Sequence, residues 1–469
     1  MPIFLRPRKG NKDAVFPLKP WDAAERRLEE FRDAGIGMVE IYAPAEAGNS
    51  FLGLDTIDRF KVDSRIGTLD DIRRFVDLAH GKGLKIISID NFGYCSVEAV
   101  DFLKACDDVK AGRETRETRM FLWADSPGAP PPPSAGRSDP YFMVRPTHLA
   151  GYNAAKVEIW APSSRAGKHY WSRWDGVDLA GNRVRLPQYN WFSDEFQEEC
   201  EKVVRFWMDT GVDGIMIDAV NWYVGCDWQK TRKRMTDVIN SYGVKYSQPE
   251  GAGAFRDDPV PWVTDGGWTC VQDYGLGILW EKGTNVISNA IETGDPRPLE
   301  PALRNYHDRV VQAGGILFFA PLRFEDAAKT HLAVAATAAF GDLLSWSAVF
   351  DGLWSPVIPD AEEARVMKLK AAHPALFNRS RRLQLPVAAP ERHYAFLRAA
   401  RDGSERMIVV LNFQPEGQTA ELNVSGVDFA TATDLLAGGV FMREALWRVE
   451  LPAFGYRFFQ LDARKDGRA

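Results

Sequence analysis

The chain has 469 residues, of which 45% are hydrophobic and 26% charged, and its formal net charge is −6. This length exceeds one ordinary hydrophobic core, so more than one domain is expected, and the interspersed charges lack the basic footprint of proteins that bind nucleic acid or anionic membranes. Five cysteines without metal-ligand spacing, and no apolar run of signal-peptide or membrane-spanning length, predict a cytoplasmic protein without a disulfide framework, a zinc site or a membrane span.

Strands and helices alternate over the first 90 residues. Short apolar runs predict strands, and apolar residues at steps of three and four predict helices between them. Before the third strand, Thr68 and Asp71 have the spacing of a capping box, and Gly81 and Gly83 end the helix that the box begins. The expected strands are residues 3–5, 36–42 and 84–89, and the first helix is 21–34.

The stretch from about 91 to 185 has no regular period. Its proline run at 130–133, with nearby serine and glycine residues, predicts irregular structure. A structureless segment of this length is uncommon in a compact domain unless it has a function, so we expect an inserted loop domain. Its aromatic residues either stack on a ligand or pack the insert, and packing is the commoner role of such side chains. The candidates are Trp160, Tyr170, Trp171 and Trp174.

The stretch from Leu186 to Val220 has the clearest pattern in the chain. Ser193 can cap a helix that has an acidic first turn and an apolar stripe. A buried strand at 214–217 then ends at Asp218. Because α/β barrels place catalytic groups at the carboxyl ends of their strands, Asp218 is a candidate nucleophile; the alternative is a turn or helix-capping aspartate.

Two further acids follow later strands. The run 244–250 predicts a short strand with Glu250 at its tip. Asp326 lies between a predicted strand and a predicted helix, whereas His307 and Asp308 fall in a helical pattern, which predicts an exposed helix face.

The pattern of predicted secondary structure changes from about residue 380. Short strand-like runs are separated by turn signals such as Asp402 with Gly403, which predicts a small all-β domain. No repeat and no candidate chemistry occurs in it. Its expected strands are 393–398, 406–412, 419–424 and 456–461, and the elements that precede the domain are a strand at 342–346 and a helix at 361–372.

These motifs resemble the alpha-amylase superfamily (glycoside hydrolase family 13). LPQYNW followed by GVDGIMIDAV is similar to the family's LPDLNW and GVDGFRIDAV, and KVEIWAPSSRAGKHYW is similar to the oligosaccharide-cleaving alpha-glucosidase branch. The resemblance implies a (β/α)8 TIM barrel with an inserted lid domain after strand 3 and a C-terminal antiparallel β-sandwich. The implied domains are 1–90 with 186–379 for the barrel, 91–185 for the lid, and 380–469 for the sandwich.

The resemblance also assigns roles to the three acids. Asp218 matches the nucleophile, Glu250 the general acid/base, and Asp326 the carboxylate that holds sugar hydroxyls at the transition state. His307 with Asp308 is closer in letters to the family's NHD motif for this third acid, but Asp326 has the family's position just before a helix, so we prefer Asp326. A carboxyl pair about 5 Å apart displaces the leaving group with retention of configuration. No cofactor is expected, and no metal, because the family's calcium-binding Asn near the third strand is absent.

The residues around the reacting sugar depart from the family. Met216 replaces an Arg, Glu325 replaces a His, and Gly93 with Tyr94 stands where the family writes Asn and His. FLGLD replaces the glucose-gripping DNGYD of the glucosidase branch, so the pocket becomes more apolar. The candidate substrate-binding residues are Phe51, Leu54, Asp90, Tyr94, Met216, Trp222 and Glu325.

Two classes of function fit this combination. One is a retaining alpha-glycoside hydrolase that acts on an unusual or modified oligosaccharide, with transglycosylation or isomerisation as variants of the same chemistry. The other is a catalytically silent relative that acts as a binding protein. We favour the enzyme, because a chain released from catalysis has no reason to keep acids at all three strand tips. The expected partner is an oligosaccharide or glycoside, and a homo-oligomer is compatible with the sequence.

Overall fold

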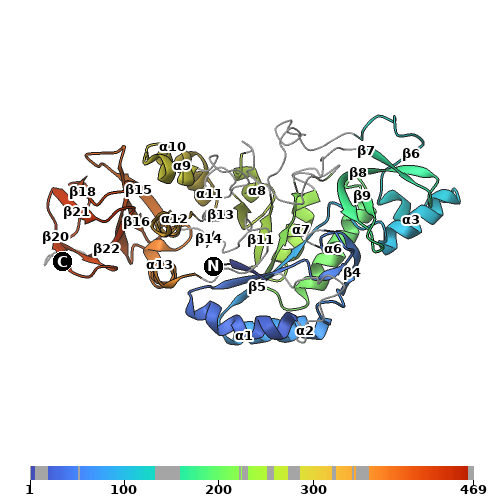
Figure 1. Ribbon diagram of the computed structural model, residues 1–469, viewed down its shortest axis with the longest axis horizontal. Helices are drawn as coiled ribbons and strands as arrows, with labels where there is room; N and C mark the ends of the chain where they lie inside the picture. Colours follow the sequence, from blue (N-terminus) through green and yellow to red (C-terminus); the bar gives the residue numbers. More distant parts are fainter. Residues whose placement is uncertain are drawn as a thin grey trace.

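The computed structural model shows an α/β barrel between two further domains (Figure 1). The C-terminal strands lie at one end of the long axis, and the strands inserted after the third barrel strand lie at the other. The residues described are 2–5, 20–50, 53–132, 159–220, 223, 231–243, 245–250, 258–272, 286–319, 324–340, 343–344 and 359–462. In these ranges, no helix has both the length and the apolar character needed to cross a lipid bilayer.

The described residues contain eight parallel barrel strands, and their spatial order follows the chain. Side-chain hydroxyls join the sheet that holds the first five to the sheet that holds the last three, since the amide of Ser247 donates to Thr269 Oγ1 at 2.8 Å. This order is the one that the predicted barrel requires. The strands are β1 (Pro2–Leu5), β2 (Met38–Tyr42), β5 (Lys85–Asp90), β10 (Gly214–Ile217), β11 (Tyr246–Pro249), β12 (Cys270–Gln272), β13 (Ile316–Phe319) and β14 (Leu343–Leu344).

Helices alternate with these strands, and both predicted N-terminal caps are confirmed. The Thr68 hydroxyl accepts the amide of Asp71 at 3.2 Å and the Asp71 carboxylate accepts the amide of Thr68, which completes the capping box. Ser193 accepts the amide of Phe196 at 3.3 Å. The helices are α1 (Pro20–Asp33), α2 (Leu69–Gly81), α6 (Asp194–Met208), α7 (Thr231–Asn240), α8 (Val260–Thr264), α9 (Val286–Thr293), α10 (Leu299–Leu303), the π-helix η4 (Arg304–Asp308), α11 (Arg309–Gln312), α12 (Ala327–Phe340) and α13 (Ala361–Ala372).

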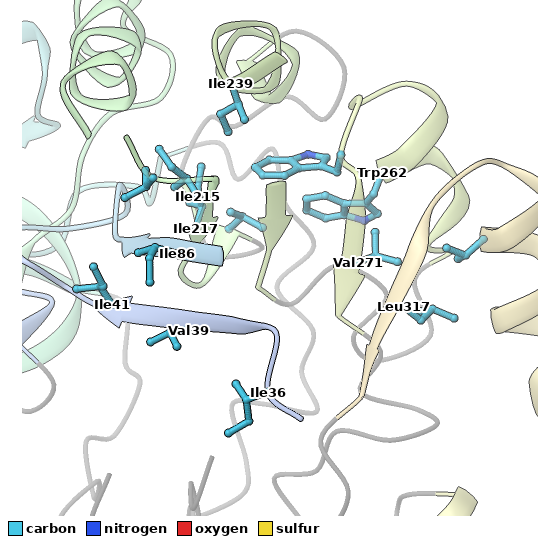
Figure 2. Close-up of a cluster of buried hydrophobic side chains, with 14 of the residues drawn as sticks. Ile36, Val39, Ile41, Ile86, Ile215, Ile217, Ile239, Trp262, Val271 and Leu317 are labelled. Carbon is cyan, nitrogen blue, oxygen red and sulfur yellow. The ribbon is translucent and has the colours of Figure 1, made fainter. Parts of the chain in front are cut away.

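Aliphatic side chains on alternate strand positions form the core between the strands and the helices. Figure 2 shows Val39 and Ile41 of β2 near Ile86 of β5 and Ile215 and Ile217 of β10. The residues between them face the other way, into the barrel, because side chains alternate along a strand. A second cluster of buried side chains occupies that interior, and it includes Ile87, Ile89, Met216, Tyr246 and Cys270.

One interior position carries an acid. Glu40 lies between Val39 and Ile41 and is in register with Ile87 of β5, so its side chain faces the barrel interior. It is fully buried, and neither carboxyl oxygen has a hydrogen-bond partner among the described residues. Burial raises the pKa of Glu40 to about 8. The group is therefore held as a neutral acid at pH 7.

The prediction of irregular structure between residues 91 and 185 is wrong for the described part. Phe102, Phe121 and Tyr170 pack together with ring centroids 5.0 Å apart in two of the pairs, and they are part of the main hydrophobic core, so the segment has buried aromatic side chains to fold around. A four-stranded antiparallel sheet and two helices result. They are α3 (Val100–Lys110), α4 (Arg116–Arg119), β6 (Trp123–Ala124), β7 (Ile159–Ser163), β8 (Lys168–Val177) and β9 (Arg183–Pro187).

The C-terminal domain is the predicted β-sandwich. A six-stranded antiparallel sheet faces a two-stranded one, and buried side chains of both, such as Ile408, Leu422 and Trp447, fill the space between them. The larger sheet contains β15 (Arg381–Leu385), β16 (His393–Ala399), β17 (Arg406–Asn412), β22 (Tyr456–Asp462), β19 (Thr431–Asp434) and β20 (Val440–Met442), and the smaller contains β18 (Gln418–Asn423) and β21 (Leu446–Leu451).

Candidate active site

Asp218 and Glu250 follow neighbouring barrel strands at the same edge of the sheet. β10 and β11 are paired up to Ile217 and Pro249, and the amide of Glu250 donates to Ile217 O at 2.8 Å. Asp218 is 8% exposed, and Glu250 is half-buried. Neighbouring strands are about 4.8 Å apart, which is close to the separation that a retaining carboxylate pair needs. The arrangement thus suits a nucleophile beside an acid/base.

The peptide unit after Asp218 links the two acids. Ala219 adopts a left-handed backbone conformation, with φ of 50°, and its amide donates to Glu250 Oε2 at 2.8 Å. The carbonyl at the other side of that peptide unit, Asp218 O, accepts the hydroxyl of Tyr223 at 2.5 Å. A left-handed conformation is costly for a residue with a Cβ, and such strain concentrates at functional sites.

Asp326 lies where the sequence predicts, after β13 and before α12. Its side chain is exposed, and its Oδ1 accepts the amide of Ala328 at 2.8 Å, which is a helix-capping contact. Glu325 beside it is also exposed. The described contacts do not bring these two residues together with Asp218, so the third catalytic role stays a prediction.

His307 and Asp308 were predicted on an exposed helix face, and this is wrong. His307 is 1% exposed, with Nδ1 3.0 Å from Asp308 Oδ1, and Asp308 forms an ion pair of 2.8 Å with Arg382 of β15. The physical reason is that the C-terminal domain covers this face of η4. A helical period shows which residues share a face, but it does not show that another domain packs against that face.

Three of the predicted substrate-binding residues come together. Leu54, Tyr94 and Met216 are 3%, 6% and 4% exposed and belong to the second buried apolar cluster, which also contains Ile87 and Ile89 of β5. Trp174 of the insert joins them, with its ring 5.8 Å from that of Tyr94. The other aromatic candidates of the insert pack within it; Trp160 and Trp171, for example, contact each other edge to face at 5.0 Å.

Asp90 faces a different environment from this cluster. It alternates with Ile89 along β5, and its carboxyl, 3% exposed, accepts the amide of Asn91 at 2.7 Å. Burial raises the pKa of Asp90 to about 6, although the positive charge of Arg59 opposes the shift. A role in substrate binding stays a prediction for Asp90. Phe51 and Trp222 lie outside the described residues.

Three residues organise the site without having been predicted from the sequence. Asn91 is fully buried, and its side chain donates to Leu54 O at 3.1 Å and accepts the amide of Gly93 at 2.7 Å. Tyr223 and Ala219 fix the peptide after Asp218. Asn91 follows a predicted strand directly, so its place at the strand tip could have been predicted from the sequence. The left-handed backbone of Ala219 could not, because alanine is not a residue type that favours this conformation.

Within the described ranges, no group of three or more His, Cys, Asp or Glu side chains could hold a metal ion. The described cysteines, Cys95, Cys106, Cys200 and Cys270, are all buried.

Comparisons with known proteins identify relatives of both the barrel and the C-terminal domain. The family model "Alpha amylase, catalytic domain" matches residues 34–251, and "Maltogenic Amylase, C-terminal domain" matches residues 384–458. An oligo-1,6-glucosidase of Heyndrickxia coagulans is 23% identical over 195 residues, which cover 41% of this chain and 30% of the relative. A trehalose synthase of Thermus thermophilus is 25% identical, over 43% of this chain and 18% of the relative.

Solved structures resemble the whole chain. The alpha-amylase from H. orenii has a TM-score of 0.71 at 15% identity, over 98% of this chain and 99% of its own. The trehalose-6-phosphate hydrolase of Bacillus licheniformis has a TM-score of 0.70 at 13% identity, again over 98% and 99%. At such identities the likeness concerns the fold, and the curated relatives are matched over no more than about a third of their length.

Proposed function

We propose that the chain, which matches the family models of the alpha-amylase catalytic domain and the maltogenic amylase C-terminal domain, is a retaining glycoside hydrolase in which Asp218 is the nucleophile and Glu250 the acid/base. The observation that carries the proposal is the position of these two carboxyl groups at adjacent strand tips, joined through the amide of Ala219. The relatives that support it are named as glucosidases, a trehalose synthase and a neopullulanase.

The chemistry has two steps. In the first, an Asp218 oxygen attacks the anomeric carbon while Glu250 gives its proton to the departing glycosidic oxygen, so that a glycosyl ester forms and the leaving sugar departs neutral. In the second, Glu250 takes a proton from water, which attacks the same carbon and releases Asp218 as a carboxylate. Two inversions give net retention.

The substrate that we propose is an unusual or modified oligosaccharide. Leu54, Tyr94, Met216 and Trp174 belong to one buried apolar cluster. The first three stand where the family resemblance implies polar side chains. A plain glucosyl ring would leave buried hydroxyls without partners there, at roughly 1–3 kcal/mol each. A deoxygenated or substituted ring avoids that cost.

Transfer to a sugar acceptor is a second candidate, favoured by the similarity to a trehalose synthase. It uses the same covalent intermediate, and only the molecule that attacks this intermediate differs: a sugar hydroxyl in place of water. A silent binding protein is the remaining alternative.

Trapping of the glycosyl ester tests the proposal. Incubation with a panel of fluorinated alpha-glycosyl fluorides, whose slow second step accumulates the intermediate, should raise the intact mass by one glycosyl unit, and the added mass should map to the peptide that contains Asp218. Asp218→Asn is the matched control and should gain no mass. Absence of both trapping and turnover on a broad panel of aryl alpha-glycosides would favour the binding protein.

A further inference from the structure

The hydroxyl of Tyr223 bridges the tips of two barrel strands. It donates to Asp218 O at 2.5 Å and accepts the amide of Phe92, beyond the end of β5, at 3.0 Å. The ring is 3% exposed and stacks on Trp191, with centroids 5.1 Å apart and an angle of 13° between the planes. Trp191 in turn donates its indole N–H to Phe92 O at 2.9 Å. Both polar atoms of the Phe92 backbone are therefore held by this stacked pair.

The close approach of the ring depends on a residue without a side chain. A Cβ at position 93 would lie 2.6 Å from Cε1 of Tyr223, so Gly93 leaves the space that the ring fills. Real Cβ atoms do not come that close to another carbon, and the buried ring has little room to move. The hydroxyl is thus placed by stacking on one side and by Gly93 on the other.

The two hydrogen bonds at Asp218 and Ala219 belong to one peptide unit. The carbonyl of a trans peptide points away from the N–H of the same unit, so a donor that fixes the carbonyl also fixes the direction of the N–H. Here Tyr223 holds the Asp218 carbonyl, and the N–H of Ala219 points to Glu250 Oε2, 2.8 Å away. The left-handed conformation of Ala219 is unfavourable by itself, and rotation of this peptide would relieve it.

We propose that Tyr223 is a positioning residue that acts on Glu250 through the peptide between Asp218 and Ala219. Its hydroxyl keeps that peptide in the strained orientation in which the Ala219 N–H holds the Glu250 carboxylate beside the nucleophile. The expected effect on catalysis rests on the proposed function. The hydrogen bond by which Tyr223 holds the peptide does not depend on that function.

The test compares Tyr223→Phe with Tyr189→Phe. Tyr189 is a matched control because it is also buried, at 1% exposed, and its hydroxyl also donates a hydrogen bond, in this case to the Asp101 carboxylate at 2.8 Å. In Tyr223→Phe, kcat should fall about ten-fold while KM changes by less than about two-fold, because the variant loses the hydrogen bond that fixes the peptide holding Glu250. Hydrogen exchange at the amides of Phe92 and Ala219 should also become at least about ten-fold faster. In Tyr189→Phe, neither quantity should change.

Gly93→Ala provides a second variant, which keeps the tyrosine but displaces its ring and, with the ring, its hydroxyl. It should reproduce both the fall in kcat and the faster exchange. Unchanged exchange in Tyr223→Phe would overturn the proposal whatever the activity, and unchanged kcat in an active enzyme, or an equal loss in Tyr189→Phe, would overturn it as well. If the unaltered protein turns over no glycoside, the proposed function fails, while the exchange comparison still decides whether Tyr223 fixes the peptide.

Discussion

Arg382 of the C-terminal domain forms an ion pair of 2.8 Å with Asp308 of the barrel, and its side chain is only 1% exposed. The same guanidinium contacts Glu300 of α10 at 2.5 Å and the hydroxyl of Tyr394 at 2.8 Å. A buried ionic cluster therefore joins the two domains. Such a cluster is costly to break from one side, because the partners that remain are left charged and desolvated.

Arg382→Ala should lower the free energy of unfolding by about 3 kcal/mol, which is the usual range for one-sided loss of a buried ion pair. Urea denaturation followed by tryptophan fluorescence measures it. Arg448→Ala is the control: Arg448 pairs with Glu421 at 2.9 Å, but its side chain is 71% exposed, so a change within about 0.5 kcal/mol is expected. Equal effects in the two variants would contradict the structural role of Arg382.

Asp218→Asn should reduce turnover by more than a hundred-fold, because it removes the covalent catalyst. The thermal midpoint should hardly change, since the replacement is nearly isosteric and lies at the mouth of the barrel. Asp213→Asn makes the same substitution at the opposite end of β10, where Asp213 contacts His80 at 2.7 Å and Lys85 at 3.0 Å. It should affect stability and spare turnover. An Asp218→Asn enzyme with more than about a hundredth of the original rate would remove Asp218 from the nucleophile's role.

The first product released should keep the anomeric configuration of the substrate. Asp218 and Glu250 follow adjacent strands, which favours the short separation of a retaining pair over the wider one that accommodates a direct attack by water. Proton NMR of the anomeric signals in the first minutes distinguishes the two, before mutarotation mixes them. Initial inversion would show that the pair is misassigned.

Starch-type substrates should be poor. We expect kcat/KM on maltose and maltotriose below about 10⁴ per molar per second, the lower end for competent enzymes, because the cluster around Met216 and Tyr94 offers a glucosyl ring few hydrogen-bond partners. The control is the substrate that the trapping panel identifies. Efficient cleavage of maltose would show that other residues supply the missing contacts.

Glu40 should make stability fall as pH rises. Its pKa is raised to about 8 by burial, so between the unfolded value near 4.5 and about 8 the native state keeps a proton that the unfolded chain has lost. The stabilisation is full below pH 4.5 and lost as the pH passes 8, with a slope of up to about 1.4 kcal/mol per pH unit. Glu40→Gln should remove this slope. If the curves of unfolding free energy against pH were parallel for the two proteins, the pKa of Glu40 in the folded protein would not be raised.

Local sequence signals were sufficient for much of the fold. The capping box at Thr68, the cap at Ser193 and the strand before Asp218 depend on neighbours in the chain, and all three appear as expected. Features that depend on distant contacts were not visible. The insert folds around aromatic residues far apart in sequence, and His307 is buried by a domain that begins many residues later.

The site shows the same division. Strand-tip positions follow from the order of barrel elements, so the sequence could point to Asp218 and Glu250 as neighbours. It could not show that Asp90 faces away from Ile89, toward Arg59, because both faces of a buried parallel strand are occupied by similar residue types. Nor could it reveal the backbone of Ala219, whose conformation is imposed by its partners.

The contact between Gly93 and Tyr223 constrains how this chain can change. An Asn at position 93, as the family has it, would bring its Cβ against a ring carbon that lies 2.6 Å from the ideal position, so that reversion alone damages the strand tip. Replacing Tyr223 first removes the hydroxyl that both Phe92 and Asp218 use. The two positions therefore form an epistatic pair, and an evolutionary or engineered path toward a glucose-cleaving pocket has to alter them together.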